Sequence, residues 1–295
     1  MHSSTKPPRS TKPAWLRQRL PSGPEYEVVR RVVTDHGLNT VCREAACPNQ
    51  FACYGEGTAT FMILGERCTR NCRFCAVEHG PEAPPDPGEP ERVAVAVARL
   101  GLRYAVITSV TRDDLADGGA GLFAATIRAI RRRNPTGRIE VLIPDLQGDS
   151  VALATILEAG PDVLNHNLET VPSLYPLVRP GAVYHRSLML LHRARQRAPG
   201  IPTKSGLMLG LGEELGELEQ VWADLLAAGC TILTMGQYLQ PSRAHLPVKR
   251  FVPPEEFAEL GELALKMGFA GVASGPFVRS SFRAEELFLR ALGRQ

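Results

Sequence analysis

Short apolar runs rich in β-branched residues recur along the chain and alternate with longer amphipathic segments. The apolar runs predict strands over residues 61–64, 104–110, 138–143, 162–168, 203–209, 232–239 and 270–273. The amphipathic segments between them predict helices over residues 91–100, 120–133, 150–159, 185–197, 214–228 and 254–267. Glycines follow four of these helices, as expected where helices end: Gly101, Gly160, Gly229 and Gly268.

The alternation of strands and helices predicts an α/β fold, because parallel strands need long crossover connections. Six or seven such units indicate a partial (β/α) TIM-like barrel with N-terminal and C-terminal extensions. A doubly wound open sheet is the alternative, and periodicity alone does not separate the two. We expect residues 61–275 to form the barrel, residues 1–60 an N-terminal extension, and residues 276–295 a C-terminal segment. Within 1–60, a disordered arm should precede a short helix over 25–35 and a loop-like stretch.

Composition narrows the class of protein. Of 295 residues, 44% are hydrophobic and 22% charged, which is typical of a globular chain. The net charge of +3 is too small for the strongly basic face that nucleic-acid binding requires, so we expect no nucleic-acid partner. No apolar run approaches the roughly 18 residues of a membrane span. We therefore expect a cytoplasmic protein without membrane attachment.

Cysteine placement is the strongest chemical signal. Six of the seven cysteines lie within residues 42–75, in two groups of three. An odd number of cysteines without a secretory signal is a poor disulfide framework, and clustered cysteines in a reducing compartment indicate metal binding or catalysis. The seventh, Cys230, precedes a predicted strand and is expected to be a small buried apolar residue.

The second group has the spacing C-x3-C-x2-C: Cys68, Cys72 and Cys75. It follows the first predicted barrel strand, where loops of parallel barrels build active sites. Three thiolates on one loop can hold three irons of a 4Fe-4S cluster and leave the fourth open to a small molecule. The alternatives are a ferredoxin-type cluster, or a zinc knuckle with His79 as its local fourth ligand.

This spacing, with the aromatic Phe74 before the last cysteine, resembles the radical S-adenosylmethionine (SAM) superfamily. The resemblance implies that Cys68, Cys72 and Cys75 hold a 4Fe-4S cluster whose open iron binds the amino and carboxylate groups of SAM. It further implies reductive cleavage of SAM to a 5′-deoxyadenosyl radical. That radical abstracts hydrogen from an unactivated carbon.

The first group has the spacing C-x4-C-x5-C: Cys42, Cys47 and Cys53. It predicts a second cluster, with a structural zinc or iron site as the alternative. Together the two groups resemble lipoyl synthase, and the resemblance runs from about Pro13 to Glu286. It is carried by the runs KPAWLRQRLP, CREAACPNQFACYGEGTATFMILG, CTRNCRFCAV, TSVTRDDLADGG, VLIPDLQG, NHNLET, TKSGLMLGLGE, MGQYLQPS and GPFVRSSF.

The lipoyl synthase resemblance implies that the first cysteine group binds an auxiliary 4Fe-4S cluster consumed as the sulfur donor. Its fourth ligand would be a serine of an Arg-Ser-Ser-Tyr motif, which reads Arg279-Ser280-Ser281-Phe282 here and assigns the ligand to Ser281. Phe282 departs from the family tyrosine, so any hydrogen bond of that hydroxyl is lost.

The implied reaction inserts two sulfur atoms into an octanoyl chain carried on a lysine of lipoyl carrier domains, at the cost of two SAM molecules. The implied partners are the carriers, namely 2-oxoacid dehydrogenase subunits and the glycine cleavage H protein, and an electron donor such as ferredoxin or flavodoxin. Another sulfur-inserting radical SAM enzyme, of the biotin synthase-like or methylthio-transferring kind, is one alternative. A non-catalytic iron–sulfur carrier is the other.

The run Asn-His-Asn-Leu-Glu-Thr, at residues 165–170, is similar to biotin synthase-like enzymes. By that likeness Asn167 and Glu169 would bind the ribose hydroxyls of SAM, as carboxylates do in dinucleotide sites. Arg179 is a candidate for the methionine carboxylate, because guanidinium and carboxylate pair bidentately. The alternative for each is a core polar residue or a surface ion pair. Lys204 either faces the site or is solvated.

Overall fold

The computed structural model describes residues 12–17 and 23–293. In these ranges eight strands form one sheet, and their spatial order follows their sequence order. Strand β1 pairs with β2 antiparallel, and every later neighbouring pair is parallel. The strands are β1 Asn39–Thr40, β2 Thr60–Ile63, β3 Tyr104–Ser109, β4 Arg138–Leu142, β5 Val163–Asn165, β6 Thr203–Leu209, β7 Ile232–Gln237 and β8 Gly271–Gly275.

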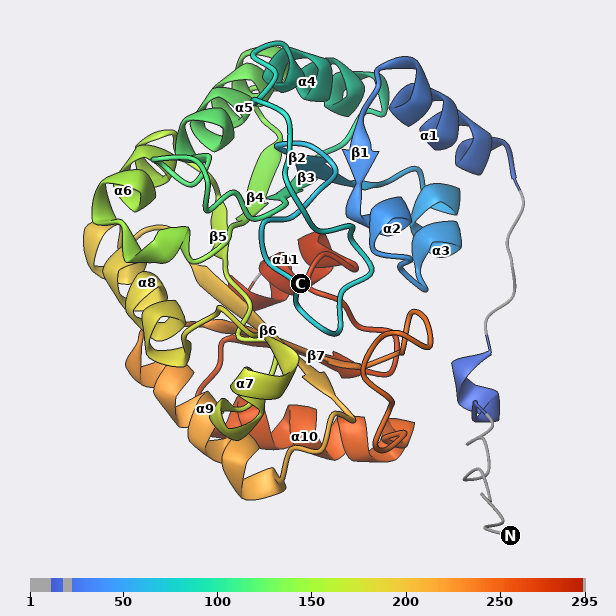
Figure 1. Ribbon diagram of the computed structural model, residues 1–295, viewed down its shortest axis with the longest axis vertical. Coiled ribbons are helices and arrows are strands. Elements are labelled where there is room, and N and C mark those ends of the chain that lie inside the picture. The colour runs from blue at the N-terminus through green and yellow to red at the C-terminus, as the bar shows by residue number, and fades with distance from the viewer. Residues whose placement is uncertain (1–11, 18–22, 294–295) are drawn as a thin grey trace, which may run out of the picture.

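The crossover helices form a ring outside the strands (Figure 1). They are α4 Glu89–Arg99, α5 Ala120–Arg133, α6 Ser150–Glu158, α8 Tyr184–Arg197, α9 Leu215–Ala227 and α10 Pro254–Met267. A doubly wound sheet would reverse its strand order partway across. The unbroken order from β1 to β8 therefore confirms the partial barrel and excludes the doubly wound alternative.

The N-terminal region differs from the sequence expectation in one respect. Helix α1 (Pro24–Asp35) is present as predicted, but the stretch expected to be loop-like contains α2 (Val41–Glu44) and α3 (Gln50–Gly55). Helix α2 forms because the side chain of Thr40 caps it, accepting a hydrogen bond from the backbone N–H of Arg43 at 3.3 Å. The arm expected to be disordered lies mostly outside the described residues; Ala14–Leu16 form a single 3₁₀ turn, η1.

Shorter elements sit at the carboxyl ends of the strands. They are the 3₁₀ turns η2 (Leu146–Gly148) and η3 (Pro172–Leu174) and the helix α7 (Tyr175–Val178). Strand β5 ends at Asn165, earlier than the predicted 168, because the chain leaves the ladder there. Glu169 has φ 67°, a left-handed conformation that turns the chain after β5.

A C-terminal helix that the sequence pattern did not predict, α11 (Ala284–Ala291), lies in the middle of the strand ring (Figure 1). Ala284 and Phe288 form an apolar cluster with Tyr104, Val106 and Val163 on β3 and β5. The rings of Phe288 and Tyr104 lie 5.8 Å apart between centroids. Tyr104 and Val163 are the first residues of β3 and β5, so helix α11 packs into the open barrel at the end where the strands begin.

A buried polar layer lies in the same part of the barrel. The ammonium of Lys204 donates to both carboxylate oxygens of Glu140, at 2.9 and 3.1 Å. Tyr104 Oη and Asn165 Nδ2 also donate to Glu140, at 2.7 and 2.9 Å. Lys204 is 1% exposed, so the solvated reading of this residue is wrong. Cys230 is buried at 1%, as expected.

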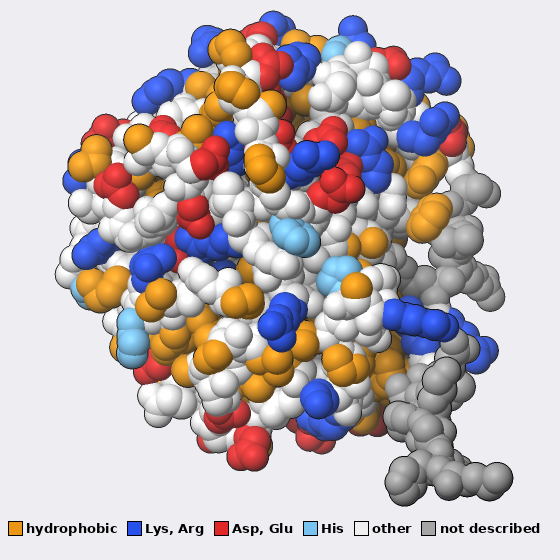
Figure 2. Space-filling view, in the orientation of Figure 1, with side chains coloured by type: hydrophobic (Ala, Val, Ile, Leu, Met, Phe, Trp, Pro, Cys, Tyr) orange, Lys and Arg blue, Asp and Glu red, His pale blue; other side chains and the backbone are white. Residues whose placement is uncertain are grey.

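The outer surface carries charges of both signs interspersed over the face shown in Figure 2. Arg131, Arg132 and Arg133 at the end of α5 pair with Asp162 and Glu91. Among the described residues, no helix combines the length and apolarity needed to span a membrane.

Candidate active site

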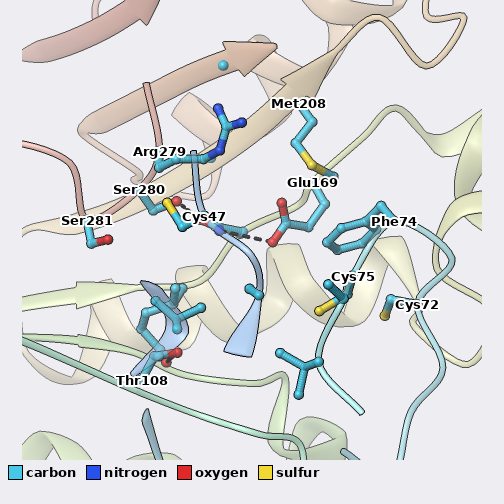
Figure 3. A pocket seen from close by; sticks show the side chains of 18 of the residues that line it. Cys47, Cys72, Phe74, Cys75, Thr108, Glu169, Met208, Arg279, Ser280 and Ser281 are labelled. Carbon is cyan, nitrogen blue, oxygen red and sulfur yellow. Dashed lines mark hydrogen bonds between the residues drawn. The ribbon is translucent and has the colours of Figure 1, made fainter. Parts of the chain in front are cut away.

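A cavity of about 540 Å³ opens at the carboxyl ends of the strands. This is the end of a parallel barrel at which active sites form. Both cysteine groups contribute to its wall. Cys72, Phe74 and Cys75 lie on one side of the cavity, and Cys47, Ser280 and Ser281 lie on the other (Figure 3). The candidate residues that line it are Cys47, Cys68, Cys72, Phe74, Cys75, Asn167, Glu169, Arg179 and Ser281.

The loop after β2 folds back on itself and brings its three cysteines together. The N–H of Cys68 donates to Glu78 O at 2.8 Å, and the N–H of Cys75 donates to Cys72 O at 3.0 Å. The sulfur of Cys68 accepts from the N–H of Thr111 at 3.3 Å. Short local bonds therefore fix three thiols on one loop of the cavity wall.

An ion-pair network ties this cysteine loop to the loops after β3 and β4. Arg70, two residues after Cys68, donates from Nε to Asp113 and from Nη2 to Asp145, each at 2.6 Å. Its side chain is 7% exposed, and the carboxylates raise the pKa of its guanidinium against the cost of burial. Arg70 was not among the sequence candidates, because nothing in the local spacing reveals partners 43 and 75 residues away.

The chemistry of the donor set fits an iron–sulfur cluster. Burial raises the pKa of the Cys75 thiol to about 12 and also raises that of Cys72. Thiols in such surroundings ionise only when a cation compensates the charge. Three soft sulfur donors on one loop suit iron–sulfur ligation. Among the described residues, no three His, Cys, Asp or Glu side chains are grouped to hold a single metal ion.

The first cysteine group spans α2 and α3. The N–H of Cys47 donates to Cys42 O at 3.1 Å, and that of Cys53 donates to Asn49 O at 2.9 Å. Burial raises the pKa of Cys42 to about 11, and the nearby Cys47 raises it further. Burial also raises the pKa of Cys53, and the nearby thiols of Cys42 and Cys47 add to that rise. The three thiols thus interact electrostatically, although only Cys47 of the three reaches the cavity wall.

The C-terminal segment enters the cavity beside β6 and β7. Two glycines on these strands make room for it. A Cβ on Gly206 would lie 2.7 Å from the Oγ of Ser280, and a Cβ on Gly236 would overlap the carbonyl of Val278. Asn49 Nδ2 donates to Phe277 O at 2.6 Å and so joins the segment to the first cysteine group. This packing places Ser281 on the same side of the cavity as Cys47 (Figure 3).

The turn after β5 supplies the polar side chains predicted to bind ribose. Asn167 Nδ2 donates to Glu169 Oε1 at 3.0 Å. The backbone of Glu169 bridges to β6, donating to Gly206 O at 2.9 Å and accepting from the N–H of Met208 at 2.8 Å. Burial raises the pKa of Glu169, and the positive charge of Arg179 opposes that rise.

Arg179 is 9% exposed, and its Nη1 makes hydrogen bonds to the turn after β5. It donates to the carbonyls of Asn167 and Leu168 at 3.0 and 2.9 Å, and to Tyr175 Oη at 3.2 Å. Among the described residues its Nε has no partner. The surface ion-pair alternative for Arg179 is wrong. The residue supports the turn and lines the cavity.

Two neighbours of Ser281 also reach the cavity. Arg279 lines it, and the guanidinium of Arg279 donates to Val278 O at 2.6 Å. Ser280 Oγ donates to Asn167 Oδ1 at 2.8 Å. In the sequence both residues stand out only as parts of the motif, because adjacent positions of an irregular segment have no periodicity that indicates their orientation.

Comparison with known proteins identifies relatives of part of the chain and of nearly all of it. The radical SAM superfamily pattern matches residues 62–225. Structural similarity extends to HydG, a maturase of the [FeFe]-hydrogenase, with a TM-score of 0.57, 17% identity, and 78% of this chain and 53% of that chain covered. Methylornithine synthase matches with a TM-score of 0.51 and 15% identity, over 64% of this chain and 55% of the other. At these identities the likeness concerns the fold alone.

Curated relatives match almost the whole chain. The lipoyl synthase of Desulfotalea psychrophila is 64% identical over 290 residues, which cover 98% of this chain and 97% of the relative. That of Methylococcus capsulatus is 59% identical over 276 residues, covering 93% and 86%. The chain therefore belongs to the lipoyl synthase family of the radical SAM superfamily.

Proposed function

We propose that this chain is a sulfurtransferase that inserts two sulfur atoms into the octanoyl chain on a lysine of lipoyl carrier domains. The observation that carries the proposal is one cavity with Cys72 and Cys75 on one side and Cys47 and Ser281 on the other (Figure 3). An acyl chain entering between them would be within reach of both. A plain iron–sulfur carrier needs no such cavity.

Cys68, Cys72 and Cys75 would hold the 4Fe-4S cluster that the radical SAM family uses with S-adenosylmethionine. When bound, that cluster supplies the electron that cleaves the sulfonium. The chain's own residues would limit the access of water there. Phe74 packs against an apolar cluster that contains Val178 and Tyr238, so it shields the cysteine loop from solvent.

Asn167 and Glu169 would hold the ribose hydroxyls of SAM, because a buried carboxylate held by an adjacent amide accepts well from a diol. Arg179 would attract the methionine carboxylate through its charge. Its Nε, which has no partner among the described residues, is one donor available for this contact. These three side chains lie on one turn and its supporting helix, so they would orient SAM as a unit.

Cys42, Cys47, Cys53 and Ser281 would hold the auxiliary 4Fe-4S cluster, which in this reaction is the sulfur-donating substrate. A serine oxygen is a harder and weaker partner for iron than a thiolate, so a cluster held partly by serine is easier to dismantle. Phe282 keeps the ring of the family tyrosine without its hydroxyl, and the guanidinium of Arg283 lies 5.4 Å from its centre.

The partners proposed are octanoylated 2-oxoacid dehydrogenase subunits and the glycine cleavage H protein, with ferredoxin or flavodoxin as electron donor. We propose a cytoplasmic location, where thiols stay reduced; all seven cysteines are free in the structure. We assign the auxiliary cluster to residues 1–60, the radical chemistry to the barrel of residues 61–275, and the serine ligand to residues 276–295.

The deciding experiment is anaerobic. Reconstituted protein is mixed with a strong reductant, SAM and an octanoylated carrier domain, and the mass of the carrier is recorded. Conversion of octanoyl to lipoyl carrier is the expected result. Formation of 5′-deoxyadenosine without a change in carrier mass would contradict the substrate. Absence of both products, from protein that contains both clusters, would favour the iron–sulfur carrier alternative.

Two variants separate the two cysteine sites in the same assay. Cys72→Ala should abolish SAM cleavage, because it removes a ligand of the radical cluster. Ser281→Ala should spare SAM cleavage and impair sulfur insertion. A normal yield of lipoyl carrier from either variant would contradict the role assigned to that residue.

A further inference from the structure

The C-terminal segment makes direct contact with the predicted ribose-binding turn through Ser280. The Oγ of Ser280 donates to Asn167 Oδ1 at 2.8 Å, and Asn167 Nδ2 donates to Glu169 Oε1 at 3.0 Å. Figure 3 shows this chain of bonds running from Ser280 across to Glu169. The three side chains come from segments 113 residues apart in sequence, so only the fold brings them together.

The contact is sterically confined. Gly206, on β6, lies under the junction, and a Cβ at this position would be 2.7 Å from each of three oxygens: Asn167 Oδ1, Ser280 Oγ and Thr234 Oγ1. Gly206 pairs in register with Thr234 on β7. Ser280 therefore sits in a close-fitting notch, where its hydroxyl faces the amide of Asn167.

The two bonds together hold the Asn167 amide at both of its ends. An asparagine side chain has one acceptor oxygen and one donor nitrogen, and their assignment follows from the partners around them. The carboxylate of Glu169 accepts from the nitrogen, so the oxygen faces Ser280, whose hydroxyl donates to it. Without Ser280 the amide is free to rotate, and the bond that steadies the Glu169 carboxylate is lost in part of the population.

We propose that Ser280 is a positioning residue for SAM: it holds Asn167 and Glu169 in the arrangement that binds the ribose. SAM then binds tightly only while the C-terminal segment is seated in the cavity. The inference rests on the proposed function, since it takes from it the ribose-binding role of Asn167 and Glu169. It gives the first serine of the motif a task separate from that of Ser281.

The same segment is tied to the first cysteine group. Asn49, two residues after Cys47, donates from its side chain to Phe277 O at 2.6 Å. A continuous path of contacts therefore joins the Cys47 loop, the C-terminal segment and the ribose turn.

The test is a double-mutant cycle on the cluster-loaded protein under anaerobic conditions. The dissociation constant of SAM is measured by equilibrium binding for wild type, Ser280→Ala, Asn167→Ala and the double variant. Ser280→Ala should weaken SAM binding about tenfold, the effect of losing one partly buried hydrogen bond. In the Asn167→Ala background the same change should have almost no effect, because Ser280 acts through Asn167.

Kinetics on the same four proteins provide a second readout. Ser280→Ala should raise the KM for SAM in 5′-deoxyadenosine formation and leave kcat near the wild-type value. Iron and sulfide contents should equal those of wild type, since Ser280 is assigned no ligand role. Ser274→Ala is the matched control: its hydroxyl bonds to Phe257 O outside the cavity, so SAM affinity should not change.

Two results would overturn the inference. One is an unchanged dissociation constant in Ser280→Ala. The other is an equal loss of affinity with and without Asn167, which would mean that Ser280 only stabilises its own segment. Failure of the proposed function is distinguishable, since wild type would then bind and cleave SAM without producing lipoyl carrier.

Discussion

At the scale of single residues, the buried ion pair of Lys204 and Glu140 is the contact in which each partner depends most on the other. Each side chain is 1% exposed, and Tyr104 and Asn165 donate to the carboxylate as well. Lys204→Met should cost about 3–5 kcal/mol of unfolding free energy, because it leaves a buried carboxylate without its cation. Denaturant unfolding of the variant and wild type gives this difference.

The double variant Glu140→Gln with Lys204→Met tests the cause. Neutralising both partners removes the uncompensated charge, so most of the lost stability should return. The new amide can also donate to Asn165 Oδ1, which has no partner among the described residues. A double variant as unstable as the single one would show that Lys204 contributes by packing rather than by charge.

His166 gives the fold a dependence on pH. It is 2% exposed, with Nδ1 2.8 Å from Ile143 O and Nε2 2.9 Å from Ser187 Oγ. Burial lowers its pKa to about 4, against about 6.5 in an unfolded chain. Between these values the unfolded state binds more protons, so stability falls as pH is lowered from about 6.5 to 4.

The expected loss from His166 is about 3 kcal/mol across that interval. It is measured as the unfolding free energy of cluster-free protein at pH 7, 5 and 4. His166→Gln lacks the titrating ring, so its stability should fall less over the same range. Parallel pH profiles for the two proteins would assign the acid sensitivity to other groups.

At the scale of elements, the sequence predicted what depends on local periodicity or spacing. The barrel strands and crossover helices follow from apolar patterns, and the cysteine loop from its spacing. Lys204 was ambiguous, because its partner Glu140 lies 64 residues away. Strand β1, with two residues, is too short to have a period, and α11 lies outside the strand–helix alternation that guided the prediction.

Gly236 on β7 leaves the space in which the C-terminal segment packs. A side chain there would overlap the carbonyl of Val278, so Gly236→Ala should displace the C-terminal segment. Hydrogen exchange of backbone amides in residues 276–283 should become faster, and stability should fall by about 1–3 kcal/mol. Gly216→Ala on α9 is the control, because a Cβ there meets no atom within 4 Å. Equal exchange in wild type and Gly236→Ala would mean that the segment adjusts without leaving.

At the scale of the whole molecule, the question is how an open barrel is held in shape. Strands β1 and β8 are the two ends of the strand order, so hydrogen bonds between them do not close the sheet. Helix α11 lies inside the ring and contacts β3, β7 and β8 (Figure 1). It thereby joins the two sides of the barrel from within, and the segment with Ser280 and Ser281 leads directly into it.

Phe288 should carry much of this connection, since it is 6% exposed and packs on Tyr104 across the interior. Phe288→Ala should cost about 3–5 kcal/mol, because it leaves a cavity between strands that no hydrogen bond joins. For a chain of this length the midpoint of thermal unfolding should fall by about 5–8 °C. Leu289→Ala, at a neighbouring position that is 38% exposed, should change it little. If the two variants melt at the same temperature, the barrel holds its shape without α11, and the C-terminal segment must be anchored by its contacts in the cavity alone.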